Sequence, residues 1–143
     1  MADISVEVKR VINAPIERVY QAWIDPEQLK QWHRPHDFTV PEAFADARTG
    51  GKYSITMMGP GGEKNIAEGV YKDLSPPNKL VMSWDWQGSD MPSTQITVNF
   101  NKLDDTKTEI ILLHEHFISQ EYADSHKEGW DSALDSLVKF EER

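Results

Sequence analysis

The sequence predicts a single α+β domain over residues 1–143, in which a curved antiparallel sheet surrounds a long C-terminal helix. Strands gathered apart from helices are typical of an α+β fold with its helices on one side of the sheet. The strands recur every ten to fourteen residues or so, which leaves no room for crossover helices and makes neighbouring strands antiparallel. A strand with histidines, residues 107–116, is followed directly by a helix over residues 120–142.

The N-terminal part of the chain predicts one strand and two short helices. Apolar and polar residues alternate over residues 4–12, which indicates a half-buried strand. A short amphipathic helix then begins at Pro15, because the first helical turn tolerates the missing N–H of proline. A second begins at Pro26, with Asp25 as its N-cap, and reaches Trp32.

Six further strands follow, separated by turns rich in glycine, proline and aspartate. One of these turns, Gly59–Gly62, is short enough for a hairpin loop. Together with the first strand these segments predict a sheet of seven strands. The six lie near residues 38–47, 51–58, 65–74, 79–86, 93–103 and 107–116.

The composition excludes several function classes. A net charge of −9 with scattered basic residues argues against nucleic-acid binding, which needs clustered lysine and arginine. The chain has no cysteine, so disulfides and thiolate metal sites are excluded. No apolar run reaches the roughly 20 residues of a membrane span, and no signal peptide is evident, so we expect a soluble cytoplasmic protein.

Four stretches, in this order, carry a resemblance to a known family: Val11–Trp23, Arg48–Tyr53, Gly69–Tyr71 with Pro76–Trp84, and Gly129–Leu137. The chain resembles the START-like superfamily, also called SRPBCC or birch-pollen-allergen-like. Within it, the chain is similar to homologues of the activator of the 90-kDa heat-shock-protein ATPase. The resemblance implies a helix-grip fold and three classes of function: carriage of hydrophobic ligands, cyclase or aromatase catalysis, and co-chaperone action with a chaperone as partner.

Strand periodicity indicates which side chains line the cavity between sheet and helix, because alternate residues of a strand face opposite sides. On the last strand, periodicity places both histidines on one face and Ile111 and Leu113 on the other, and either face could be the inner one. The resemblance implies that the face with the histidines is the inner one, which leaves Ile111 and Leu113 as an outer strip. An exposed apolar strip is usually covered, so we predict a homodimer through these two residues. The expected inner residues are Tyr53, Ile55, Met57, Leu80, Met82, Trp84, Trp86, Ile96, Val98, Phe100, Ile110, Leu112, His114 and His116.

The predicted function is the binding of a small hydrophobic or aromatic ligand in this cavity. The C-terminal helix closes the cavity with a stripe centred on Trp130, which we expect to be buried against Trp84 or Met82. The candidate ligand-binding residues are Trp84, Trp86, Met57, Phe100, Trp130 and Met82 for contact, and His114, His116 or Tyr53 for orientation.

A cyclase-like enzyme is the alternative, although binding without catalysis is favoured. His114 and His116 would lie roughly 7 Å apart on one strand face, where they could act as acid and base or share a metal with His126. No recognisable metal-site motif supports that metal, so no cofactor or metal is expected.

Polar residues elsewhere have plainer interpretations. Glu42 and Asp46, with Arg48, could orient a polar group, but Asp46 and Arg48 could equally form an ion pair at a strand end. His33 and His36 belong to the loop expected at the cavity mouth, and histidines in loops are usually solvated.

Overall fold

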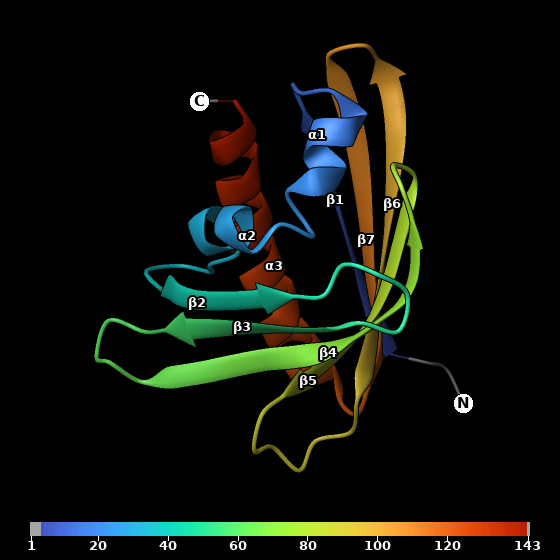
Figure 1. Cartoon of the computed structure of the whole chain (residues 1–143). Coiled ribbons are helices and arrows are strands. Elements are labelled where there is room, and N and C mark those ends of the chain that lie inside the picture. Colours follow the sequence, from blue (N-terminus) through green and yellow to red (C-terminus); the bar gives the residue numbers. More distant parts are fainter. Residues whose placement is uncertain (1–3, 143) are drawn as a thin grey trace.

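A seven-stranded antiparallel sheet curves around a long C-terminal helix in the computed structural model, which describes residues 4–142 (Figure 1). The predicted fold class is therefore confirmed, with element boundaries that differ by a few residues. The elements are β1 (Ile4–Ile12), α1 (Ile16–Gln21), α2 (Pro26–Trp32), β2 (Thr39–Ala45), β3 (Lys52–Met58), β4 (Lys64–Ser75), β5 (Lys79–Trp86), β6 (Thr94–Asp104), β7 (Lys107–Phe117) and α3 (Gln120–Glu141).

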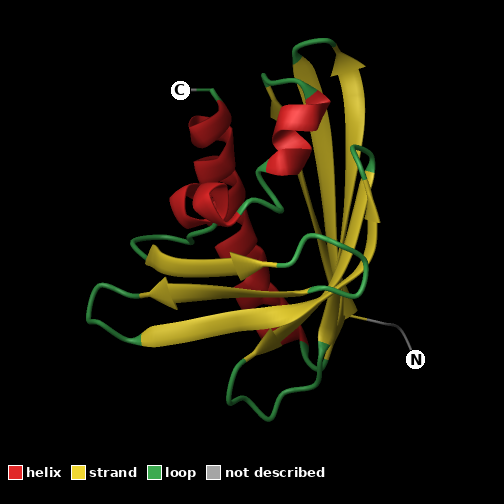
Figure 2. Cartoon of the chain, in the orientation of Figure 1, coloured by secondary structure: helices red, strands yellow, loops and turns green. Residues whose placement is uncertain are grey.

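The strand order is β1-β7-β6-β5-β4-β3-β2, so β1 and β2 form the two open edges of the sheet. Every neighbouring pair is antiparallel, as the short turns predict. The sheet bends so strongly that β2 and β3 run across the direction of β6 and β7, and all helices lie on its concave side (Figure 2). This curvature lets both ends of the sheet approach α3.

A row of buried side chains crosses the concave face from strand to strand. Tyr71 pairs with Met82, Met82 with Ile96, Ile96 with His114, and His114 with Val6. All five residues are buried, as expected for alternate strand positions that face the helix. His114 is the polar residue of this row, so its ring nitrogens require partners inside the protein.

A bulge in β7 reverses the predicted orientation of His116. Ile4 pairs with Phe117 whereas Ser5 pairs with Glu115, so His116 is the extra residue of β7 at this point. Its φ of 75° lies in the left-handed region, and the residue is exposed. The prediction that His114 and His116 share a face is therefore wrong, because the extra residue of a bulge shifts the alternation and Phe117 takes the inner position.

Helix α2 begins as predicted. The Asp25 carboxylate accepts a hydrogen bond from the backbone N–H of Glu27 at 3.0 Å and another from the Gln28 side chain at 3.0 Å. At the end of the helix, the Trp32 indole N–H donates to the carbonyl of Ala22 at 2.8 Å. This bond ties α2 to the residue that follows α1.

Helix α3 is held against β1 and α1 by apolar contacts and by ion pairs at its edges. Arg10 of β1 bonds to Asp131 at 3.2 Å and to Asp135 at 3.0 Å. Arg18 of α1 bonds to the buried Glu141 at 3.0 Å. The apolar side chains of α3 that are buried are Ala123, Trp130, Ala133, Leu134, Leu137 and Phe140.

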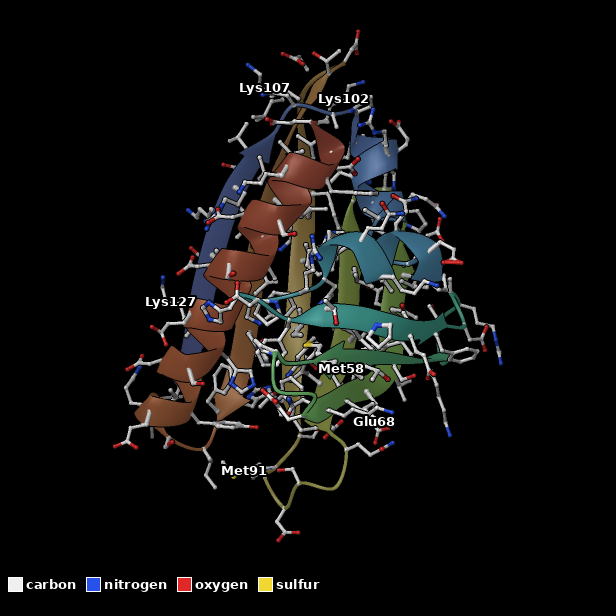
Figure 3. All side chains as sticks on the ribbon, turned by 90° about the vertical axis from the view of Figure 1, so that its left-hand side faces the viewer. Met58, Glu68, Met91, Lys102, Lys107 and Lys127 are labelled. Atoms are coloured by element: carbon white, nitrogen blue, oxygen red, sulfur yellow. The ribbon has the colours of Figure 1, made fainter. Side chains whose placement is uncertain are left out.

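Basic side chains are spread over the molecule. Figure 3 shows Lys127 on α3, while Lys102 and Lys107 lie far from it at the tip of the β6–β7 hairpin. Among the described residues, no helix has the length and hydropathy that crossing a membrane requires.

Candidate ligand-binding pocket

A pocket of about 310 Å³ opens between the N-terminal half of α3, the loop after α2, and strands β3 to β5. We call it the α3 pocket. Trp84 and Trp130 are its buried aromatic residues, whereas Trp86 and Phe38 are half-buried. Its volume lies near the lower end of the range for small-molecule sites, which begins at about 300 Å³.

Four of the nine predicted site residues line the α3 pocket: Met57, Trp84, Trp86 and Trp130. The other five lie elsewhere. The part of the predicted site that forms the pocket is therefore the part beside the N-terminal half of α3. The five outside the pocket lining are Tyr53, Met82, Phe100, His114 and His116.

All five tryptophans of the chain form one connected cluster, which we call the tryptophan row. Ring centroids are 5.4 Å apart for Trp86 and Trp84, and 5.4 Å for Trp84 and Trp130. The row continues from Trp130 to Trp23 at 6.0 Å and from Trp23 to Trp32 at 4.7 Å. The predicted burial of Trp130 against Trp84 is confirmed, since Trp130 is 3% exposed.

His114 uses both ring nitrogens inside the protein. Its Nδ1 accepts the indole N–H of Trp130 at 2.9 Å, so the ring proton must lie on Nε2. That N–H points to the Thr94 hydroxyl at 2.7 Å, which in turn donates to the carbonyl of Trp84 at 3.0 Å. Both nitrogens are thus engaged within the protein, His114 does not line the pocket, and its ring positions Trp130.

Burial keeps His114 neutral. Desolvation lowers its pKa from 6.5 to about 2, and the nearby His126 contributes in the same direction. A second proton on Nδ1 would face the donor N–H of Trp130, so the hydrogen-bond geometry disfavours the charged form as well.

His126 of α3 also accepts a hydrogen bond from a tryptophan, in this case from a tryptophan of the sheet. Its Nε2 accepts the indole N–H of Trp86 at 3.0 Å, and its Nδ1 donates to the backbone carbonyl of Tyr122 at 2.9 Å. Burial lowers its pKa below the usual value. A tryptophan of the helix therefore bonds to a histidine of the sheet, and a tryptophan of the sheet bonds to a histidine of the helix.

His33 is one of the pocket residues that the sequence did not predict, as are Phe38, Glu128 and Gly129. The expectation of a solvated loop histidine is wrong for His33, because it is 2% exposed and stacks on Trp84 at 5.8 Å with an interplanar angle of 13°. Burial lowers its pKa to about 4, against a smaller opposing effect of its own backbone. Neither ring nitrogen has a partner in another described residue, nor does the indole N–H of Trp84.

The loop that carries His33 lies at the pocket, as predicted from the fold, and His36 is exposed there. Gly129 of α3 faces this loop, and a Cβ built on it would meet Pro35 at 3.9 Å, an ordinary contact. No sequence signal distinguished His33 from His36, because burial depends on aromatic rings that come from distant segments.

Three other predicted site residues belong to the packed core. The Tyr53 hydroxyl donates to the carbonyl of Ser83 at 2.5 Å, and burial raises its pKa well above the usual value. Phe100 contacts Tyr20 of α1 with ring centroids 4.9 Å apart. Met82 is 3% exposed in the same core.

Two further polar predictions can be compared with the structure. Arg48 and Asp46 form an ion pair of 2.8 Å, as the plainer interpretation predicts. Over residues 4–142, no group of three or more histidine, aspartate or glutamate side chains is placed to hold a metal ion.

Comparisons with known proteins agree with this architecture. Protein CV1439 from Chromobacterium violaceum is 25% identical, with a TM-score of 0.88 over 97% of this chain and 97% of that chain. CalU16 from Micromonospora echinospora is 26% identical, with a TM-score of 0.75 over 96% of this chain and 76% of that chain.

The AHSA1 protein from Silicibacter pomeroyi is 22% identical and has a TM-score of 0.85 over 95% of this chain and 96% of that chain. This likeness shows the shared fold. No curated protein matches the sequence significantly. Residues 13–142 match the family described as "Activator of Hsp90 ATPase homolog 1-like protein", and the chain therefore belongs to that family.

Proposed function

We propose that the protein binds a small hydrophobic or aromatic ligand in the α3 pocket. The observation that carries this proposal is an open pocket of about 310 Å³ whose buried wall includes Trp84 and Trp130. Most apolar side chains between sheet and helix are buried in one cluster, so a gap lined by large flat rings stands out. Met57 and Phe38 add further apolar surface.

Two buried polar groups beside the pocket support a ligand with some polar character. The indole N–H of Trp84 and the ring of His33 lack partners among the described residues. An unsatisfied buried polar group typically costs about 1–3 kcal/mol, so it favours a ligand atom that satisfies it. The atoms concerned are buried, so a ligand reaches them only if neighbouring side chains move.

Replacement of Gly129 by leucine tests the proposal. The new Cβ fits against Pro35 without a clash, and the rest of the side chain extends over the pocket mouth. We expect Gly129→Leu to fold normally and to weaken binding of the neutral dye N-phenyl-1-naphthylamine by at least about tenfold, or 1.4 kcal/mol. Fluorescence titration measures this effect.

Glu121→Leu is the matched control, because it places the same side chain on an exposed position of α3 outside the pocket. Circular dichroism confirms that both variants fold. Equal dye affinities for wild type and Gly129→Leu would remove the α3 pocket as the binding site.

The family description favours a second candidate, a co-chaperone that acts on a heat-shock-protein ATPase through its surface. Phe44 is 57% exposed on β2, an open edge of the sheet, and offers an apolar contact for a partner. We expect the ATPase rate of the chaperone to rise on addition of the protein, and Phe44→Ser to reduce the rise. An unchanged rate at saturating protein would contradict this candidate.

A cyclase-like reaction has less support, because His114 and His126 already use both ring nitrogens in internal hydrogen bonds. The cytoplasmic location stays a prediction. So does the homodimer: Ile111 and Leu113 lie on the convex face but are half-buried between neighbouring strands. Light scattering tests it, and a monomeric mass over a broad concentration range would contradict it.

A further inference from the structure

We propose that the α3 pocket prefers an organic cation, an ammonium group carried on a small apolar or aromatic body, over neutral and anionic ligands of the same shape. The proposal rests on the proposed function and adds the chemical class of the ligand. It follows from two properties of the pocket lining, namely which charges it contains and which surfaces of its aromatic rings remain available.

Glu128 is the one acidic residue among the described residues that line the α3 pocket, and no lysine or arginine lines it. No hydrogen bond or ion pair joins its exposed carboxylate to another described residue. Its charge is therefore available to a ligand at the pocket mouth. The protein as a whole carries a net charge of −9, which attracts cations and repels carboxylate ligands such as fatty acids.

The histidines beside the tryptophans do not offset this negative charge. Three histidines line the pocket, of which His36 is exposed at its mouth. Burial lowers the pKa of His33 and of His126, so both are neutral near pH 7. An anionic ligand would therefore meet no buried positive charge in the wall. Its charge would lose hydration without an opposite charge to compensate it.

The aromatic rings present the surface that a cation requires. The indole N–H groups of Trp86 and Trp130 are bonded to His126 and His114, so these donors are not offered to a ligand. Both rings line the pocket together with Trp84 and Phe38. The face of an aromatic ring carries negative potential, and tryptophan attracts cations most strongly. The pocket lining thus combines aromatic rings with one carboxylate, and both attract ammonium groups.

Two isosteric ligands test this preference: benzyltrimethylammonium and neopentylbenzene, which differ in a charged nitrogen in place of a carbon. Isothermal titration of the full chain near pH 7 gives both dissociation constants, with phenylacetate as the anionic comparison. We expect the cation to bind about three- to tenfold more tightly than the neutral compound, and phenylacetate to bind most weakly. A simply apolar pocket would prefer the neutral compound, because the cation must lose its hydration.

Glu128→Gln should reduce the preference for the cation by about two- to fivefold and leave the affinity for neopentylbenzene unchanged. Glu121→Gln makes the same change in net charge on an exposed residue outside the pocket and should have no such effect. Equal effects of the two substitutions would show a general surface potential and would overturn the role of Glu128.

The two proposals fail in different ways. If neopentylbenzene binds as tightly as the cation or more tightly, ligand binding stands and the cation preference is overturned. If neither compound binds the wild-type protein, the proposed function fails and the preference for cations fails with it.

Discussion

The two halves of α3 contact the same sheet by different means. Its C-terminal half buries Leu134, Leu137 and Phe140, which require only close packing. Its N-terminal half presents His126 and Trp130, whose hydrogen bonds to the sheet require one particular tautomer of each imidazole. The α3 pocket opens beside the N-terminal half. The side-chain hydrogen bonds to the sheet and the ligand pocket therefore belong to one segment of the helix, and aliphatic packing dominates the other.

The two halves of α3 should also differ in their sensitivity to lost side-chain volume and to protonation. Aliphatic packing responds to lost volume but not to protonation, whereas a ring that accepts an N–H donor responds to both. Substitutions and pH changes should therefore affect the two halves unequally.

Truncation of Trp130 should have the largest effect. Trp130→Ala removes a ring that is 3% exposed and leaves Nδ1 of His114 without its donor. We expect a loss of about 3–5 kcal/mol in the free energy of unfolding, measured by chemical denaturation. Leu137→Ala in the C-terminal half should also destabilise, but should leave ligand affinity in the surviving fold unchanged. An unchanged denaturation midpoint for Trp130→Ala would contradict the packing role of the tryptophan row.

The second-largest effect should come from acid, which should weaken the contacts around the N-terminal half of α3. The pKa values of His33 and His114 fall from 6.5 to about 4 and about 2 in the folded protein, so only the unfolded chain takes up their protons below pH 6.5. The two neutral histidines therefore contribute their full stabilisation of the folded protein above pH 6.5, and this contribution is lost as the pH falls below that value. Between pH 7 and pH 5 the two should together cost about 4 kcal/mol of unfolding free energy.

Denaturation at several pH values measures this slope, and His33→Leu isolates one of its sources. The variant should lose about 1.4 kcal/mol per pH unit from the slope between pH 6 and pH 5. An identical slope in the variant and the wild type would show that His33 is not buried in its neutral form.

The indole N–H of Trp130 can be tested apart from its ring. Trp130→Phe keeps an aromatic side chain in the row but removes the donor to His114, and should cost about 1–3 kcal/mol. It should also raise the pKa of His114 toward its usual value, because Nδ1 loses the N–H that opposes protonation. NMR titration of the imidazole measures that shift, and an unaltered titration would contradict the tautomer assigned here.

Gly129→Ala should have the smallest effect and the opposite sign. Alanine replaces glycine inside a helix without a clash, because the added Cβ meets Pro35 at 3.9 Å. We expect a gain of about 0.5–1 kcal/mol in unfolding free energy, together with weaker ligand binding as the pocket mouth narrows. Thermal melts and dye titration measure the two effects, and a loss of stability would show that Gly129 has a structural role in α3.

The order of strands and helices could be predicted from the sequence because alternation, helix caps and turn residues are local signals. Asp25 and Pro26 mark the start of α2, and the alternation around Trp84 gives its buried side. The burial of Trp130 follows equally from helical spacing. Each of these predictions depends on a few neighbouring residues.

The candidate site could be predicted only in part, because it depends on contacts between distant segments. The bulge that turns His116 outward leaves no mark in composition, since no glycine accompanies its positive φ. His33 is buried by Trp84 and Trp130, which are far from it in the chain. The absence of Phe100 from the pocket lining likewise reflects how closely Phe100 and Tyr20 pack, which periodicity does not reveal.

The exchange of tryptophan and histidine between sheet and helix has a consequence for how α3 finds its place along the sheet. Trp130 donates to β7 and His126 accepts from β5, so the donor and the acceptor on the helix are one turn apart. If α3 slid by one turn, about 5.4 Å, an imidazole would meet an imidazole and an indole N–H would lose its acceptor. Apolar side chains alone would tolerate such sliding far better. These two hydrogen bonds therefore fix one axial position of α3 relative to the sheet.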